Sequence, residues 1–285
     1  MYLVPNMKSW FNHLLLKVVG LTFVIVFVLF VFGPFVWIFL TSIKTDAESM
    51  RIPITWWPEK PTIDAYLKMW YIEPFGLYFF NSIFVALSTA SLSTFFGTLA
   101  GYGFSRFTFR GHNVLMGSFL VTQMLSGVLL IGPYFRLVSM LGLYNTRISL
   151  IIAFTTICLP FATWMAKGYF DTVPRELEEA AFIDGCNVWR VFQKISVPLI
   201  VPGIVSALVF SFLLAWQDLL WALVLTSTQR TRVVTMALSF LVGEFRVQWP
   251  MLSAAALIGS IPSIILYICL ERYLVEGLTA GAVKE

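Results

Sequence analysis

Six apolar windows, separated by polar and charged stretches, dominate the chain. They run from Val18 to Leu40, Ile83 to Tyr102, Val114 to Tyr134, Ser149 to Tyr169, Leu199 to Leu225 and Met251 to Leu270. Each can cross the roughly 30 Å hydrocarbon core of a bilayer as a helix of about 20 residues. The pattern predicts an all-α integral membrane protein with six spans and both termini on one side.

The windows also set the expected domain organisation. Residues 1–17 form a polar N-terminal segment, 18–270 a single six-span transmembrane domain and 271–285 a C-terminal tail. The first window, at 23 residues, exceeds the roughly 7–15 apolar residues of a signal peptide. We therefore interpret it as a retained span.

Composition agrees with a membrane location. The 285 residues are 59% hydrophobic and 12% charged, whereas soluble domains carry about 25% charged residues. The net charge of +4 fits a membrane surface and does not indicate nucleic acid as a partner. Cysteines and histidines are scattered, which predicts no disulfide framework and no metal site.

Basic residues barely decide which side of the membrane is cytoplasmic. The termini and even-numbered loops hold ten of the 19 lysines and arginines, and the positive-inside rule needs a clearer excess. Only the compact loop from Phe104 to Asn113, with Arg106 and Arg110 and no acid, favours the inside. Because the termini are expected on the same side of the membrane as this loop, we expect both termini to be cytoplasmic.

One pair of glycines predicts a close helix contact. Gly97 and Gly101 lie four residues apart in the second window, so both lie on one helix face, where another helix can approach.

A charged island lies between the fourth and fifth windows. Pro174 suits a first helical position, and the glutamates that follow favour the positive end of a helix dipole: Glu176, Glu178 and Glu179. Small or apolar residues then share one face, namely Leu177, Ala180 and Ala181. The pattern predicts a short helix that can sit closely against a partner.

A turn and a second short helix are expected next. Gly185 ends the first helix, and Asn187 can cap the second. An apolar stripe at helical spacing follows, made of Val188, Val191, Phe192 and Ile195, and Pro198 is expected to stop the helix. From the residues alone, this hairpin could also lie on lipid headgroups. A DNA-binding helix-turn-helix is disfavoured because Arg190 and Lys194 face five nearby acids.

The island carries a family resemblance. Glu179-Ala180-Ala181, then Gly185, then Ile195-x-Val197-Pro198 resembles the EAA signature of membrane subunits of ABC-type importers, with Val197 where leucine is commoner. In that family two short helices couple to a cytoplasmic ATPase subunit. The resemblance implies that loop 171–198 and both termini are cytoplasmic. It assigns coupling to Leu177, Glu179, Ala180, Ala181, Asp184, Gly185, Ile195 and Pro198.

Further motifs extend the resemblance to the maltose-type carbohydrate importers. They are Asn81-Ser82, Gly101 to Gly111, Leu141-Gly142-Leu143 with Thr146, and Val275 to Lys284. The implied fold is a type I importer transmembrane domain with a core permease domain over about 77–270. Ser126 replaces a usual proline, and Trp216-Gln217-Asp218 replaces a common Trp-Asn-acid, which puts the identity of the sugar in doubt.

The resemblance also implies an assembly in the bacterial or archaeal inner membrane. Its members are a second, similar permease subunit, two ATP-binding subunits and an extracytoplasmic sugar-binding protein. The chain has no Gly-x-x-x-x-Gly-Lys-[Ser/Thr] phosphate loop, so we expect no cofactor here and expect ATP and Mg²⁺ on the partner ATPase. The chain is not expected to be an enzyme.

Candidates for the substrate path are polar or aromatic residues of the third and fifth windows: Gln123, Ser126, Trp216, Gln217 and Asp218. Each has a plainer interpretation. Asp218 could sit at the outer end of its span, satisfied by water or Arg230, and Gln123 and Ser126 could bond neighbouring helices. Trp216 also suits an interfacial aromatic belt, as do Trp56, Trp57, Trp70, Tyr71, Trp221 and Trp249.

The outer loops and the tail complete the expectations. Thr45 to Phe80 and Ser227 to Pro250 are candidates for docking the binding protein. Composition predicts a frayed tail after Arg272. The resemblance instead implies docking to the ATPase through Gly277, Thr279 and Gly281.

Other functions stay open at this level. An ion-coupled secondary transporter would need carboxylates at mid-membrane and usually shows internal repeats, and the chain offers one borderline acid, Asp218, and no repeat. A membrane enzyme lacks a recognisable motif. An importer permease for a solute other than sugar is also an alternative.

Overall fold

The computed structural model describes residues 7–71, 73–243 and 247–280, and for residues 7–15, 272 and 274–280 it describes the backbone only. Within these residues the fold is helical, with a lone bridge between Val242 and Val247. Four described helices are long and apolar enough to cross a membrane, or up to six if each of two bent helix pairs counts as one span. The chain is thus a multi-pass helical membrane protein.

The structure divides into two compact units, Met1–Ile72 with Leu241–Ile258, and Glu73–Phe240 with Gly259–Glu285. The first unit holds α1 (Met7–Ser42), α2 (Asp46–Ser49), α3 (Asp64–Tyr71) and the start of α14 (Trp249–Ala280). From Leu16 to Val36 every described side chain of α1 is exposed. Such an apolar surface requires lipid or another protein around it.

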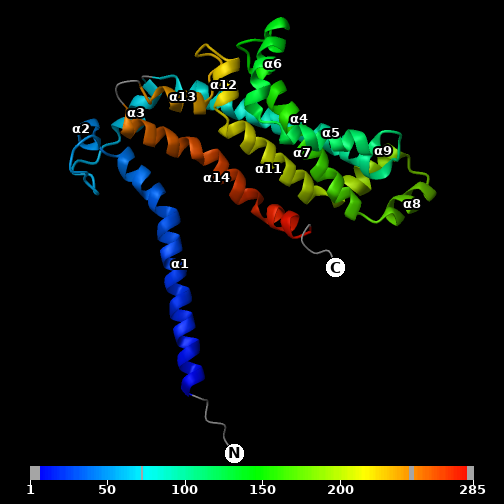
Figure 1. The fold of residues 1–285 in the computed structure, drawn as a ribbon, viewed down its shortest axis with the longest axis horizontal. Coiled ribbons are helices and arrows are strands. Elements are labelled where there is room, and N and C mark those ends of the chain that lie inside the picture. Colours follow the sequence, from blue (N-terminus) through cyan, green and yellow to red (C-terminus); the bar gives the residue numbers. More distant parts are fainter. Residues whose placement is uncertain (1–6, 72, 244–246, 281–285) are drawn as a thin grey trace, which may run out of the picture. The chain divides into compact units, whose positions relative to one another are not determined.

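Three helices form the centre of the second unit and run side by side: α4 (Phe75–Arg106), α7 (Arg147–Thr172) and α11 (Val201–Gln217) (Figure 1). Their contacts bury Val85, Phe154 and Phe212. A Cβ built on Gly97 would lie 2.6 Å from Cβ of Ala162, and one on Gly101 would lie 2.7 Å from Cβ of Ala166. The close helix approach predicted at these glycines is confirmed.

The third expected span, Val114 to Tyr134, is wrong as a single helix. The chain forms α5 (His112–Met124) and α6 (Gly127–Met140), which meet at 102°. Leu125 and Ser126 adopt extended backbone between them. Hydropathy misses such a break because it does not report φ and ψ.

The fifth expected span, Leu199 to Leu225, is also divided. Helix α11 ends at Gln217, Asp218 is extended, and α12 (Leu220–Leu225) begins after it. The Asp218 carboxylate accepts a hydrogen bond from the Trp221 N–H at 2.9 Å. A side-chain acceptor that satisfies a free N–H at a helix start stabilises that start, which explains the break. Helix α13 (Val234–Phe240) follows.

The charged island forms a hairpin from Arg175 to Leu199, as predicted. It comprises α8 (Arg175–Ile183), α9 (Val188–Val191), a π-helical turn (Phe192–Ser196) and α10 (Val197–Leu199). Pro198 does not stop the second helix; the bend of 77° comes after Leu199. Pro198 is at the start of α10, where a missing N–H is tolerated.

The frayed tail expected from composition is wrong for the residues that the structure describes. Helix α14 continues to Ala280, and a glycine inside a helix, such as Gly277, costs only about 1 kcal/mol relative to alanine. Gly277 and Thr279 are therefore on helical backbone, while Gly281 lies outside the described residues.

Candidate functional site

The turn of the hairpin closes by backbone hydrogen bonds. The Gly185 N–H donates to Phe182 O and the Cys186 N–H to Ala181 O, both at 3.0 Å. This pattern is a Schellman motif, which needs a left-handed residue after the helix, and Gly185 has a φ of 83°. Asn187 then caps α9 by accepting from the Arg190 N–H at 2.8 Å. Gly185 and Asn187 thus have the predicted roles.

One charged side chain of α8 faces inward. Glu178 is buried, and the Arg106 Nε, at the end of α4, lies 2.9 Å from each of its carboxylate oxygens. Ser196 Oγ, from the π-helical turn, donates to Glu178 Oε1 at 2.7 Å. Both short helices of the hairpin therefore meet at a single carboxylate.

The same arginine ties the hairpin to α7. Arg106 Nη2 donates to Val173 O at 3.0 Å, directly before α8. Beside it, Ser105 Oγ donates to Asp171 at 2.6 Å, and Lys167 forms an ion pair with Asp171 at 2.6 Å. Breaking a buried ion pair leaves an uncompensated charge, so the buried Arg106–Glu178 pair holds the hairpin in one position.

An aromatic cluster supports the second helix of the hairpin. Phe192 lies with its ring centroid 5.0 Å from that of Tyr102 on α4, and Tyr102 lies 5.2 Å from Phe170 on α7. Edge-on contacts at these separations add to the free energy of burial. The cluster and the Arg106–Glu178 pair join the hairpin to the ends of α4 and α7.

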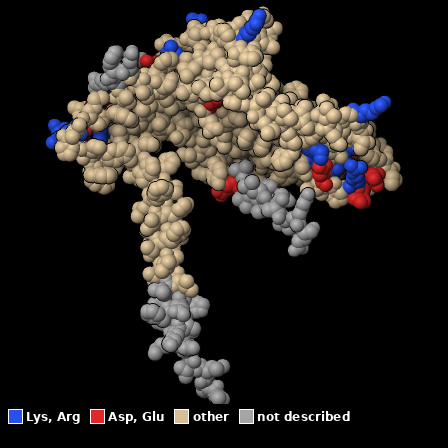
Figure 2. Space-filling model, viewed as in Figure 1, with Lys and Arg blue, Asp and Glu red and all other residues tan. Residues whose placement is uncertain are grey.

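The outer face of the hairpin is apolar at its centre and charged around it. Ile183 is 87% exposed and Leu177 47%, and Ala180, Asp184 and Val188 are also exposed. Acidic and basic side chains gather around α8 in Figure 2. An exposed apolar patch with a charged rim is typical of a docking surface.

The predicted coupling residues divide between the two faces. Leu177, Glu179, Ala180, Asp184 and Gly185 are exposed. Ala181 is buried, so it does not share the outer face with Leu177 and Ala180 as expected. Ile195 is half-buried and Pro198 exposed.

The Arg106–Glu178 pair was missed by sequence reasoning. The two residues are 72 positions apart, and each has a sufficient local explanation, as a loop cation and as a helix-dipole anion. No local pattern links them. The Gly101 to Gly111 motif pointed to Arg106 without indicating its partner.

The structure does not gather the five path candidates at one place. Trp216 is buried in the core, where its Nε1 donates to Gly259 O at 3.0 Å. Gln123 Nε2 donates to Ile157 O on α7 at 3.1 Å, and Asp218 caps α12 through its bond to the Trp221 N–H. Gln217 and Ser126 are exposed. Three of the five thus have a structural role.

The candidates for an interfacial aromatic belt fall into two groups by burial. Trp56, Trp57, Trp70, Tyr71 and Trp249 are exposed. Trp216 and Trp221 are buried in the core of the second unit instead.

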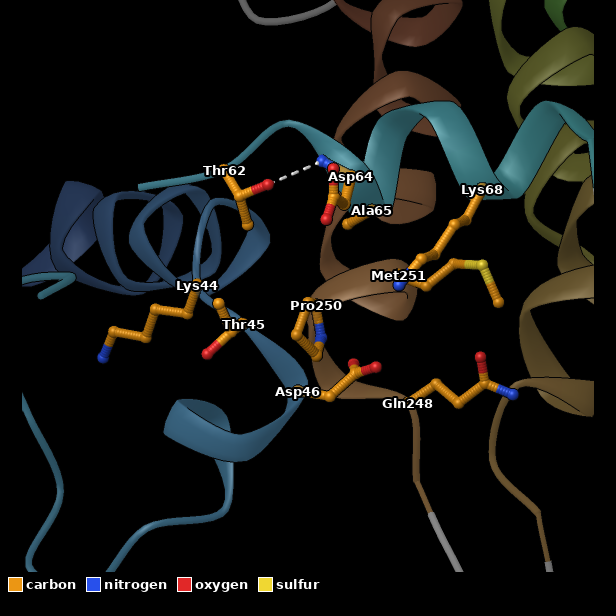
Figure 3. A pocket seen from close by; sticks show the side chains of 10 residues that line it. All are labelled: Lys44, Thr45, Asp46, Thr62, Asp64, Ala65, Lys68, Gln248, Pro250 and Met251. Atoms are coloured by element: carbon orange, nitrogen blue, oxygen red, sulfur yellow. Dashed lines mark hydrogen bonds between the residues drawn. The ribbon is translucent and has the colours of Figure 1, made fainter. Parts of the chain in front are cut away.

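Parts of the two stretches that were expected to be outer loops, Thr45 to Phe80 and Ser227 to Pro250, meet within the first unit. A pocket of about 70 Å³ is lined by residues from Lys44 to Lys68 and by Gln248, Pro250 and Met251. In Figure 3 the Lys68 side chain points toward Met251, while Lys44 points away. The lining carries both acidic and basic groups, and its volume suits a few water molecules or the end of one side chain.

Beside this pocket, a buried carboxylate orders the loop after α2. Glu48 Oε1 accepts from Thr55 Oγ1 and from the Glu59 N–H, each at 2.9 Å. Lys44 is also buried and donates to Thr55 O. Burial alone would raise the pKa of the Glu48 carboxyl, but the Glu59 and Thr55 hydrogen bonds and the Lys44 charge lower it below its ordinary value.

Comparisons with known proteins place the chain in a family. The model of the binding-protein-dependent transport system inner membrane component matches residues 93–278. The sulfoquinovosyl glycerol transport system permease protein SmoH of Agrobacterium fabrum is 34% identical, over 98% of this chain and 97% of its own. The trehalose transport system permease protein SugB of Mycobacterium tuberculosis is 34% identical, over 88% and 92%.

A solved structure shares the fold. A chain of a bacterial ABC transporter involved in the import of the acidic polysaccharide alginate superposes with a TM-score of 0.78 at 21% identity, covering 96% of this chain and 99% of that one. The family match covers the hairpin Arg175–Leu199, all of α7 and the part of α4 from residue 93 onward. The chain therefore belongs to the family of inner membrane components of binding-protein-dependent transport systems.

Proposed function

We propose that the chain is a permease subunit of an ATP-driven, binding-protein-dependent sugar importer. The relatives transport sulfoquinovosyl glycerol and trehalose, and the structural neighbour imports a polysaccharide, according to their names. These solutes are all carbohydrates. Half of the translocation path would come from this chain and half from a second, homologous permease subunit.

Coupling to ATP hydrolysis is assigned to the hairpin Arg175–Leu199. The observation that carries this proposal is the Arg106–Glu178 pair, which fixes an exposed apolar face to the ends of two long helices. When two partner ATPase subunits bind ATP and Mg²⁺ and close, a hairpin held in this way moves with α4 and α7 as a rigid body. That motion would expose the path alternately to either side.

The same proposal sets the topology. A hairpin that docks a cytoplasmic ATPase is cytoplasmic, and so are both termini. The stretches from Thr45 to Phe80 and from Ser227 to Pro250 would then face the sugar-binding protein. The end of α14, with Gly277, Thr279 and Gly281, would reach toward the ATPase dimer.

Two hairpin variants test the coupling proposal. Gly185→Pro cannot adopt the observed φ of 83°, and Glu179→Lys reverses a charge on the exposed face. Both complexes should insert, yet ATPase subunits should co-purify less or lose stimulation by the binding protein. Glu176→Gln, an exposed change on the same helix, serves as the control. Normal stimulation in both test variants would refute the assignment.

The rival functions predict that activity has different requirements for ATP, ion gradients and the ATPase subunits. An ion-coupled transporter would work without ATP when an ion gradient is present, and a membrane enzyme would turn over without any ATPase subunit. A permease for a solute other than sugar would retain ATP dependence and fail with every carbohydrate tested. Uptake by the reconstituted complex separates these cases.

A further inference from the structure

A groove of about 580 Å³ opens beside the coupling hairpin, entirely within the second unit. One wall is α4, another is the start of α11, and the third is the second helix of the hairpin. The α4 wall contributes Ser91, Thr94 and Thr98, and the hairpin wall contributes Trp189, Phe192 and Gln193. None of the five path candidates from the sequence lines this groove.

The lining residue Thr94 has a buried hydroxyl without a hydrogen-bond partner among the described residues. Its side chain is 5% exposed. Thr89 Oγ1, on the same helix, also has no partner among the described residues, whereas Ser93 Oγ donates to Thr89 O at 2.7 Å and Ser211 Oγ to Ala207 O at 2.8 Å. A buried hydroxyl without a partner is costly unless water or a ligand bonds it.

The lining combines a few polar side chains with a larger apolar surface, to which Leu99, Val197, Ile204 and Leu208 contribute. Three hydroxyls lie on one face of α4, and the Gln193 amide lies across the groove. Phe95, Trp189 and Phe192 supply aromatic faces, with Trp189 and Phe192 stacked at a centroid separation of 5.3 Å. Aromatic surface with a few placed polar groups is the usual construction of a small-molecule site, and the volume lies within the usual range.

We propose that this groove is the part of the carbohydrate path next to the coupling hairpin, filled by water and passing sugar. The proposal rests on the proposed function and assigns new residues to it: Ser91, Thr98 and Gln193 bond solute hydroxyls, and Trp189 and Phe192 stack on the ring.

Thiol accessibility tests the proposal in the complete importer, reconstituted in liposomes. The native cysteines, Cys158, Cys186 and Cys269, are first replaced by alanine. Ser91→Cys and Thr98→Cys are then compared with Leu92→Cys, which is at the depth of Ser91 on α4 but does not line the groove. The probe is a charged methanethiosulfonate, which reacts with the thiolate and therefore needs water at the thiol.

We expect the two groove cysteines to react several-fold faster than Leu92→Cys, and their modification to abolish uptake while ATPase association stays intact. Groove cysteines that react no faster than Leu92→Cys, because lipid or a partner helix fills the groove, overturn the proposal. Binding-protein-stimulated ATPase of the cysteine-free complex is measured in parallel. Stimulated ATPase activity together with unreactive groove cysteines would refute only the proposal about the groove. Loss of stimulated ATPase activity would count against the proposed function itself.

Discussion

At the residue scale, one buried carboxylate of the hairpin has a role that its neighbour along the chain does not share. Glu178 and Glu179 are adjacent, yet Glu178 is buried against Arg106 and Glu179 is exposed. The sequence predicted Glu179 for coupling and treated Glu178 as one of three helix-dipole anions. Only the helix phase relative to α4, which is a tertiary property, distinguishes the two.

Glu178→Gln should destabilise the hairpin because Arg106 would remain buried without its counter-charge. Loss of one partner of a buried pair costs about 3–5 kcal/mol, whereas an exposed change such as Glu179→Gln stays within about 0.5 kcal/mol. Thermal unfolding of the purified complex in detergent measures the difference. Equal melting temperatures for the two variants would contradict the anchoring role.

Glu48 makes the first unit sensitive to acid. Its pKa in the fold is lowered, so its stabilisation is fully present above the unfolded-state value of roughly 4.3 and is lost as pH falls through the lower folded value. Hydrogen exchange of residues 44–60 should therefore increase in acid. Glu48→Gln should exchange faster at neutral pH and show little further change. An unaltered pH profile in that variant would assign the sensitivity to another group.

At the element scale, the sequence predicted what depends on local pattern. The helix ends at Gly185 and Asn187 follow from backbone conformation and capping, and the Gly97–Gly101 contact follows from spacing. The breaks near Ser126 and Asp218 could not be predicted, since both lie inside windows of continuous hydropathy. Of the path candidates, Trp216 and Asp218 are polar groups in apolar sequence whose partners, Gly259 and Trp221, only the fold reveals.

The α4–α7 contact should not accept a methyl group at Gly97. A Cβ there would lie 2.6 Å from Ala162, and forcing extra atoms into a packed contact costs about 1–3 kcal/mol. Gly97→Ala should lower the melting temperature of the complex. Gly117→Ala is the matched control, because nothing lies within 4 Å of its Cβ position and alanine favours a helix. Similar stability for both would mean that α4 and α7 can separate freely.

At the scale of the whole molecule, the central claim is that the chain does no chemistry of its own and converts ATPase closure into solute movement. The structure supports this claim because a buried ion pair connects the exposed face of the hairpin to two long helices. The groove at the hairpin places aromatic and hydroxyl side chains beside that connection. Family membership agrees with this division of labour.

Sugar uptake into proteoliposomes tests the claim most directly. The complete importer is reconstituted with its binding protein, a panel of labelled mono- and disaccharides is supplied on the binding-protein side, and all ion gradients are collapsed. The account predicts uptake of at least one sugar that requires ATP on the hairpin side and is lost in Gly185→Pro. Uptake that persists without ATP, or that follows an imposed ion gradient, would contradict it.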